Sequence, residues 1–228
     1  MFKTFVPVLA IIALMSACSS GQKADAQSSA AASDQASAAI EPLAEAASAT
    51  PGFDCKTATL KAEIMVCGNA RLAQLDVELT RLYDLISQAP DVDKGGLQRL
   101  QGGWLNKRNA CATVADAETC LLNAYGERIS DLRAGYPVAR NDTSISIGPV
   151  SWHCPAGDIS STFINGANAM VYVKWADKSA VLPQVISASG ARYAADLPEG
   201  AFEFWNKGNE VMWTVPGSGK VTCKEIKL

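Results

Sequence analysis

The spacing of the apolar residues changes once along this 228-residue chain, and this change limits the folds it can adopt. Between residues 51 and 136, apolar side chains recur every three or four positions, as they do on one face of an amphipathic helix. From residue 148 onward they alternate in short runs separated by Gly, Asn, Asp and Pro, a pattern typical of strands. The sequence therefore predicts two domains, an all-α disulfide-linked helical domain at 51–136 and a small all-β domain at 148–228, joined by a polar linker at 137–147.

The helical pattern is clearest after Asn69, whose side chain can cap the start of a helix. The apolar residues that follow form one stripe, which we interpret as core: Leu72, Leu75, Leu79, Leu82 and Ile86. Further helical spacing occurs at 97–105 and 121–132. Gly135 can end the last helix, and Pro137 prevents its continuation.

Short runs of alternating apolar residues define the expected strands of the second domain. These runs are Val150–Cys154, Ile159–Ile164, Met170–Trp175, Ala201–Trp205, Val211–Val215 and Lys220–Lys224. Many short strands at close spacing favour an antiparallel barrel, and an open two-layer sandwich is the alternative.

The N-terminus carries an apolar run, Phe5–Met15, that ends shortly before Cys18. The run is too short to span a bilayer, which takes roughly 18 or more apolar residues, so it predicts a signal peptide at 1–17. Residues Leu14–Cys18 resemble the lipobox of bacterial lipoproteins, which implies that Cys18 is acylated and anchors the chain to a membrane. By the same resemblance, Ser19 implies sorting to the outer membrane, facing the periplasm. An ordinary cleaved signal peptide with a free thiol at Cys18 is the alternative.

Residues 18–50 follow the signal peptide and are dominated by alanine and serine, with no aromatic residue. Such a segment buries too little apolar surface to offset the entropy of ordering it. We interpret it as a tether between the membrane and the folded domains.

The seven cysteines divide among these segments. Once Cys18 is set aside, Cys154 and Cys223 are alone in the β domain and are expected to form a disulfide there. The helical domain contains the other four, for which the preferred pairing is Cys55–Cys67 with Cys111–Cys120. Zinc binding by these four is disfavoured, because they lack a close Cys-x-x-Cys pair and a nearby histidine.

Charge and composition exclude several functions. The formal charge of −3 and the pI near 5.2 argue against nucleic-acid binding. The chain has one histidine, His153, around which no catalytic triad can be assembled. Paired carboxylates are the remaining route to hydrolysis, and the acids near the later motifs, Asp196, Glu199, Glu203 and Glu210, are interpreted as solvated. We therefore expect no enzyme activity, metal or cofactor.

The helical domain resembles the LprI-like N-terminal domain family of bacterial envelope proteins along its whole length. The residues that carry the resemblance are Phe53-Asp54-Cys55, Ile64–Cys67, Leu72–Asp76, Leu82-Tyr83, Trp104-Leu105 with Arg108 and Cys111, and Cys120–Ile129. One departure from the family pattern is Gly102-Gly103, which should weaken the helix that contains it.

The β domain resembles the MliC/PliC family of inhibitors of c-type lysozyme. Two segments carry this resemblance, Ser187–Tyr193 and Phe204–Glu210, framed by Trp152-His153-Cys154 and Cys223. The family resemblance implies that Ser189 is directed at the catalytic carboxyl groups of lysozyme and that Lys207 pairs with one of them. A turn serine and a solvated lysine are the alternatives.

Gly190, Arg192 and Tyr193 complete the lysozyme-binding site that this resemblance implies. Gly190 allows a tight turn and a close approach of the backbone. Arg192 is either a contact at the rim or part of a local ion pair. Tyr193 is a candidate contact residue, although core or loop support is favoured for it and for Trp205.

The sequence thus predicts an envelope protein that inhibits c-type lysozyme. The alternative is an envelope scaffold that binds peptidoglycan or an endogenous lytic enzyme. The sequence does not distinguish a monomer from a homodimer.

Overall fold

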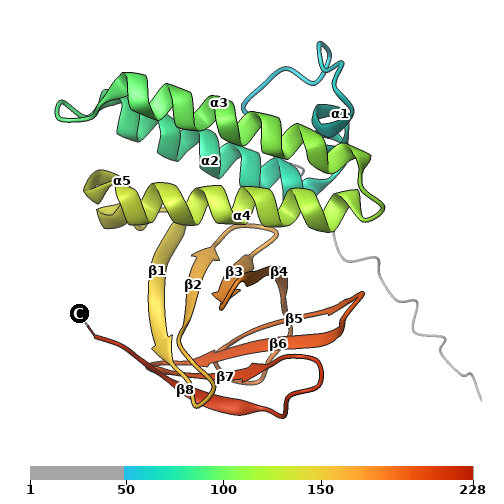
Figure 1. The fold of residues 1–228 in the computed structure, drawn as a ribbon, viewed down its shortest axis with the longest axis vertical. Coiled ribbons are helices and arrows are strands. Elements are labelled where there is room, and N and C mark those ends of the chain that lie inside the picture. Colours follow the sequence, from blue (N-terminus) through green and yellow to red (C-terminus); the bar gives the residue numbers. More distant parts are fainter. Residues whose placement is uncertain (1–48, 228) are drawn as a thin grey trace, which may run out of the picture. The chain divides into compact units, whose positions relative to one another are not determined.

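The structure is a computed structural model and describes residues 49–227. The predicted signal peptide, the predicted acylation site at Cys18 and most of the expected tether lie outside these residues. Within 49–227, none of the helices combines the length and apolar character that a membrane span requires. The helices precede the strands in the chain, with all helices before residue 142 and all strands after residue 145 (Figure 1).

The helical part has the predicted caps and core. Its elements are α1 (Lys61–Cys67), α2 (Ala70–Gln88), α3 (Lys94–Ala110), the 3-10 helix η1 (Cys111–Thr113), α4 (Ala117–Gly135) and α5 (Pro137–Asn141). The side chain of Asn69 caps α2, because its Oδ1 accepts hydrogen bonds from the backbone N–H groups of Arg71 (3.0 Å) and Leu72 (3.1 Å). All five apolar stripe residues of α2 are buried. Helix α5 lies within the segment expected to be a linker.

Two disulfides hold the helical part together. They join Cys55 to Cys67 and Cys111 to Cys120, the pairing preferred from the sequence. These four thiols are therefore not available as zinc ligands. In a domain with a modest core, a native disulfide typically contributes about 2–5 kcal/mol.

Eight antiparallel strands form a closed barrel in the order of the chain. They are β1 (Ser146–His153), β2 (Ile159–Ile164), β3 (Met170–Trp175), β4 (Lys178–Val185), β5 (Ala191–Leu197), β6 (Gly200–Lys207), β7 (Glu210–Thr214) and β8 (Val221–Glu225). Pairing of Trp152 with Glu225 and of His153 with Lys224 joins β1 to β8, so the barrel prediction is confirmed over the sandwich. The disulfide Cys154–Cys223 reinforces the same closure.

The prediction missed β4 and β5. Strand β4 contains Pro183, which has no N–H group and argues against a strand interior. In the structure this proline is near the end of β4, opposite Met170. Strand β5 contains three Ala and one Asp, which have low strand propensity, and its pairing with β6 over seven residues overrides that preference.

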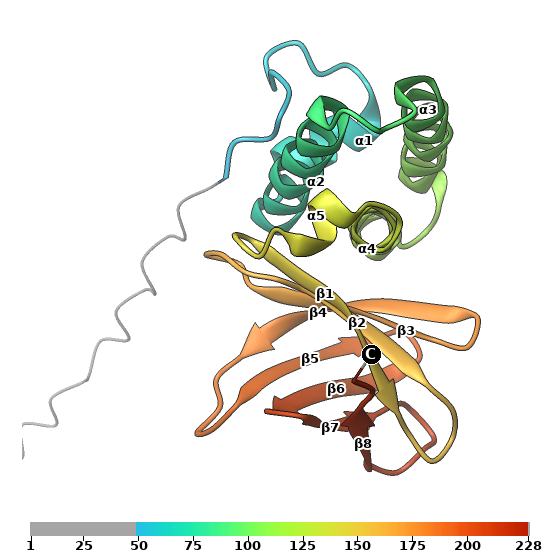
Figure 2. The same cartoon turned by 90° about the vertical axis from the view of Figure 1, so that its left-hand side faces the viewer.

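The outer face of β3 is covered by the helices, so this face and the helices share one core while the barrel interior forms a second. Val171 and Val173 lie in the barrel core, whereas Met170 and Tyr172 belong to the core of the helical part. Helix α4 passes over this side of the barrel (Figure 2). At Gly126 of α4 an added Cβ would lie 2.7 Å from the Tyr172 ring, so glycine allows the helix to approach the strands.

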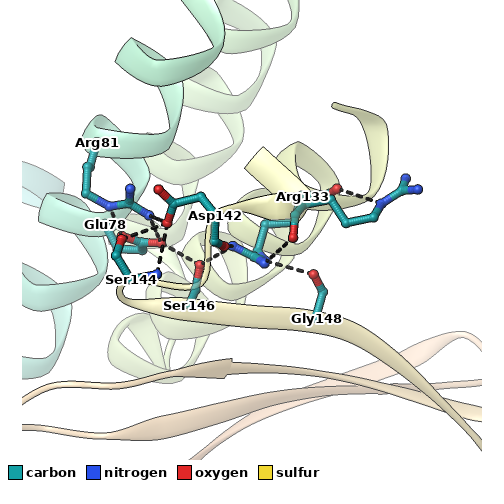
Figure 3. A network of polar contacts seen from close by, with 8 residues as sticks. Glu78, Arg81, Arg133, Asp142, Ser144, Ser146 and Gly148 are labelled. Carbon is teal, nitrogen blue, oxygen red and sulfur yellow. Dashed lines mark hydrogen bonds and ion pairs between the residues drawn. The ribbon is translucent and has the colours of Figure 1, made fainter. Parts of the chain in front are cut away.

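A buried polar network also crosses this junction (Figure 3). Glu78 of α2 is fully buried and binds Arg81 Nε at 2.7 Å and the hydroxyl of Ser146 on β1. Arg133 of α4 is also fully buried and donates to the Gly148 carbonyl at 2.8 Å and to Ser146 Oγ at 3.1 Å. Polar groups removed from water need such partners, and this network provides them between α2, α4 and β1.

Candidate functional site

Two loops that carry the sequence motifs lie side by side at one end of the barrel. The β4–β5 loop covers residues 186–190, and the β6–β7 turn covers residues 208 and 209. They are neighbours because β5 pairs with β6, with Ala191 opposite Asn206. Gly190, which has φ +68°, allows the two loops to approach this closely. A Cβ added at this position would lie 2.3 Å from the Asn206 carbonyl oxygen. Any side chain at Gly190 would push the loops apart.

The β6–β7 turn is a two-residue hairpin between Lys207 and Glu210. Gly208 is its first central residue, with φ +64°, the position at which type II′ hairpins need glycine. The side-chain amide of Asn206 donates to the carbonyls of Gly208 (3.1 Å) and Glu210 (3.3 Å) and so fixes the turn from within.

Ser189 is held through its backbone and is exposed at the surface. Its carbonyl oxygen accepts hydrogen bonds from the Trp205 indole N–H and the Ser187 hydroxyl, both at 2.8 Å. Among residues 49–227, its own hydroxyl has no hydrogen-bond partner. The loop is therefore ordered while the Ser189 hydroxyl is left to bind another molecule.

Lys207 lies beside this loop, since a Cβ added at Gly190 would be 3.0 Å from its Cγ. Its Nζ lies 3.8 Å from the centre of the Trp205 ring, a cation–π contact. Within the described part of the chain, no carboxylate forms an ion pair with it. Trp205 thus positions both candidate residues, because its N–H binds the backbone of Ser189 and its ring face holds Lys207. This matches the loop-support role that the sequence favoured for Trp205.

The other two cations near Trp205, Arg192 and Lys220, share one carboxylate. Glu203 Oε2 accepts from Arg192 Nε at 2.7 Å, and Glu203 Oε1 lies 2.7 Å from Lys220 Nζ. Burial raises the pKa of Glu203, but the hydrogen bonds from Lys220 and Arg192 outweigh it and leave the pKa below its ordinary value. Arg192 therefore forms a local ion pair, one of the two roles expected for it, and its guanidinium also lies 5.8 Å from the Trp205 ring centre.

Tyr193, the remaining candidate contact residue, lies inside the barrel. It is 3% exposed and packs against Phe163 and Phe204, with ring centres 5.9 and 6.3 Å away. Burial raises the pKa of its phenol. Its place in the structure is the core position that the sequence favoured, where it supports the start of β5.

The described residues contain no arrangement that suggests catalysis at this end of the barrel. His153 is at the opposite end, where it is exposed and contacts Asp158 at 2.8 Å. Between residues 49 and 227, His, Cys, Asp and Glu side chains form no group of three or more that could hold a metal ion. The loop end offers a hydroxyl and a cation, which suit the binding of a carboxylate.

Comparison with known proteins gives two matches that together cover both parts of the chain. Residues 152–222 match the family described as membrane-bound lysozyme-inhibitor of c-type lysozyme. The chain is also 28% identical over 179 residues to Lipoprotein LprI of Mycobacterium bovis and of Mycobacterium tuberculosis, which covers 76% of this chain and 85% of the relative. No solved structure matches.

Proposed function

This chain carries an LprI-like helical domain followed by a C-terminal MliC domain, and we therefore propose that it inhibits c-type lysozyme. Lysozyme of this class cleaves its substrate with two carboxyl groups in a cleft. A protein that blocks the cleft needs a protruding loop, a hydroxyl to hydrogen-bond a carboxyl group and a cation to pair with a carboxylate. The loop end of the barrel offers all three.

In this mechanism Ser189 and Lys207 enter the cleft together. The observation that carries the proposal is the arrangement around Trp205, which binds the Ser189 carbonyl at 2.8 Å and the Lys207 ammonium at 3.8 Å from its ring centre. Both side chains are thereby positioned before the partner arrives, which lowers the entropy lost on binding. Glu203 pairs with Arg192 and Lys220 and not with Lys207, so the Lys207 ammonium can pair with a carboxylate of the partner.

Affinity in this mechanism comes from the fit of the loops. The β domain contains as many acidic as basic residues, so long-range attraction by net charge is small. A buried pair between Lys207 and a lysozyme carboxylate would be the main charged contact, and its loss would leave a buried charge without a partner.

The proposed location is the bacterial cell envelope, with the chain anchored to the outer membrane through acylated Cys18 and facing the periplasm. Similarity to lipoproteins and to a family of membrane-bound inhibitors supports this location. The Ala/Ser-rich tether would let the inhibitory loops reach a lysozyme that enters the envelope.

The test is titration of the purified full chain against a c-type lysozyme, with cell-wall hydrolysis as the readout. We expect inhibition by the wild type, and at least about 30-fold weaker inhibition by the double variant Ser189→Ala and Lys207→Ala, which corresponds to a combined loss of about 2 kcal/mol or more, the size of one central contact. The matched control is Ser218→Ala and Lys178→Ala, which removes the same groups from exposed positions at the opposite end of the barrel.

Two results would contradict the proposal in different ways. Absence of inhibition by micromolar wild-type protein would refute the function, and binding to isolated peptidoglycan would then favour the scaffold alternative. Unchanged inhibition by the double variant would refute the roles of Ser189 and Lys207 and leave the function intact.

A further inference from the structure

A groove lies beside the Ser189 loop, and one of its walls belongs to the helical domain. Its volume is about 520 Å³. The lining residues are Arg71 of α2, residues 166–169 of the β2–β3 loop, and residues 183–187 with Gly190 of the β4–β5 region. The segment that presents Ser189 therefore faces α2 across this groove.

The wall formed by the helical domain is fixed in place. Gln74 of α2 is 8% exposed, and its amide donates to the carbonyls of Asn165 (3.2 Å) and Asn168 (3.1 Å) and accepts from the Asn168 N–H (2.8 Å). Gly166 allows this close contact, because an added Cβ would lie 2.9 Å from the Gln74 side chain. The first turn of α2 and the β2–β3 loop therefore form one rigid rim.

This rim is joined to α4 by a second set of contacts. Glu118 Oε1 accepts from Asn69 Nδ2 at 2.9 Å and from Arg71 NH2 at 3.1 Å. About 40% of the Arg71 side chain remains exposed, so it can still contact a partner.

The edge of the groove carries Ile186, whose side chain is 97% exposed. The other large apolar side chains at the surface of the described residues are 40–58% exposed. Single exposed apolar residues are common on protein surfaces. Ile186 differs in its position, three residues from Ser189 on the same loop, where binding would remove it from water.

We infer that the helical domain contacts the bound lysozyme, with Arg71 and Ile186 on the two sides of a groove that receives one lip of the enzyme's cleft. This inference rests on the proposed function. A loop inserted into a cleft must have one lip of the cleft on each of its sides. On one side of the Ser189 loop lies the β6–β7 turn with Lys207, and on the other lies this groove. The lip on that side therefore meets Ile186, the β2–β3 loop and α2.

The test compares single variants of the full chain by their inhibition of the same c-type lysozyme. We expect Ile186→Ser to weaken inhibition by about 10-fold and Arg71→Gln by about fivefold, in the range of contacts near an interface centre and at its edge. The matched controls are Leu100→Ser and Arg99→Gln on α3, which alter exposed residues of the same types and should change inhibition by less than about twofold.

Hydrogen exchange gives a readout that does not depend on variants. When lysozyme is added to the wild type, the backbone amides of residues 166–169 and of the first turn of α2 should exchange more slowly. The β5–β6 turn at residues 198 and 199, at the opposite end of the barrel, should exchange unchanged.

The outcomes separate this inference from the proposed function. If the wild type inhibits lysozyme but both variants match their controls and the groove is not protected, the inference is wrong and the function stands. If the free chain is a dimer that Ile186→Ser dissociates without loss of inhibition, the groove binds a second copy and the inference is again wrong. If the wild type does not inhibit at all, both fail.

Discussion

The helix–barrel junction and the loop end of the barrel both use arginine and glutamate, and they differ in how these charges are satisfied. At the junction, Arg133 and Glu78 are completely buried. Arg133 donates to four acceptors, the carbonyls of Gly148, Asp142 and Arg140 and the hydroxyl of Ser146. Burial lowers the pKa of Arg133, and the charges of Glu78 and Asp142 oppose that shift.

At the loop end the charged groups remain partly in water. The side chains of Arg192 and Lys220 are 38% and 47% exposed, and both contact one carboxylate, Glu203. Lys207 contacts only the face of Trp205 among the described residues. This arrangement leaves a donor group that a partner can use.

The two regions therefore use the same residue types differently, since the junction satisfies its buried charges within the protein and the loop end leaves Lys207 without an ion pair among the described residues. A fully buried arginine whose acceptors all come from the protein has no capacity to bind a partner, and its removal leaves buried groups unpaired. An exposed cation above an aromatic ring contributes little to stability. Variants at the junction should therefore lower stability, and variants at the loop end should lower inhibition.

The largest effect is expected for Arg133→Met at the junction. Loss of the guanidinium leaves Glu78 with one fewer cation nearby and several buried acceptors without a donor, so the free energy of unfolding should fall by about 3–5 kcal/mol. Urea unfolding measures this change. Arg99→Met, whose side chain is 77% exposed, is the control and should change stability by less than about 0.5 kcal/mol. A loss below about 1 kcal/mol for Arg133→Met would show that the junction is not the stabilising region.

A smaller effect is expected for Gly126→Ala, which tests how closely α4 approaches the barrel. The new methyl group would meet the Tyr172 ring at 2.7 Å and a Val181 methyl group at 2.8 Å, so the variant should lose about 1–3 kcal/mol of stability.

Gly103→Ala on α3 is the matched control for Gly126→Ala. An added Cβ at Gly103 has no neighbour within 4 Å, and alanine in a helix is favoured over glycine by about 0.5–1 kcal/mol. The two substitutions should therefore change the urea midpoint in opposite directions. Equal shifts would mean that α4 does not pack tightly on β3 and β4.

The sequence predicted α2 and strands β2 and β3 of this junction, but it missed β4, the start of β1 at Ser146, and the contact between the two domains. The Asn69 cap and the apolar stripe of α2 depend on local spacing, which is visible in the sequence. Burial of Glu78 depends on Ser146, 68 residues away in the chain, and burial of Arg133 depends on the folding of 140–148 against α4. Charged residues in helices are usually solvated, so neither burial was predicted. The pattern of each domain accounts only for its own elements, so the core they share was not predicted.

A signal for this contact was nevertheless present in α4. Gly126, Ser130 and Arg133 are spaced by four and three residues and form a second stripe beside the apolar one. In the structure Ser130 Oγ accepts a hydrogen bond from Thr162 on β2 at 3.1 Å, and Arg133 binds β1. The uninterrupted apolar run Met170–Val173 was a matching signal, since a strand buried on both faces does not alternate.

Only part of the candidate site could be predicted, because its motifs are visible in the sequence and the strand pairing that brings them together is not. The motifs place Ser189 and Lys207 on loops, and the pairing of β5 with β6 that brings these loops together became clear only in the structure. Trp205 was expected to support a loop, but its hydrogen bond to Ser189 depends on that pairing. Ile186 and Arg71 carried no sequence signal, because their importance comes from a groove built by three separate segments.

The smallest effect is expected for Arg192→Met, which tests the loop end against the junction. Arg192 shares Glu203 with Lys220, so its loss leaves the carboxylate paired, and the partly exposed ion pair should contribute less than about 1 kcal/mol to stability. Methionine keeps an apolar stem near Trp205, so Lys207 and Ser189 should stay in place and inhibition should weaken by no more than about threefold. Urea unfolding and lysozyme inhibition, measured on the same protein beside Arg133→Met, give the comparison directly. A stability loss equal to that of Arg133→Met would mean that the loop end also holds the fold together, and the division between a stabilising region and a binding region would be wrong.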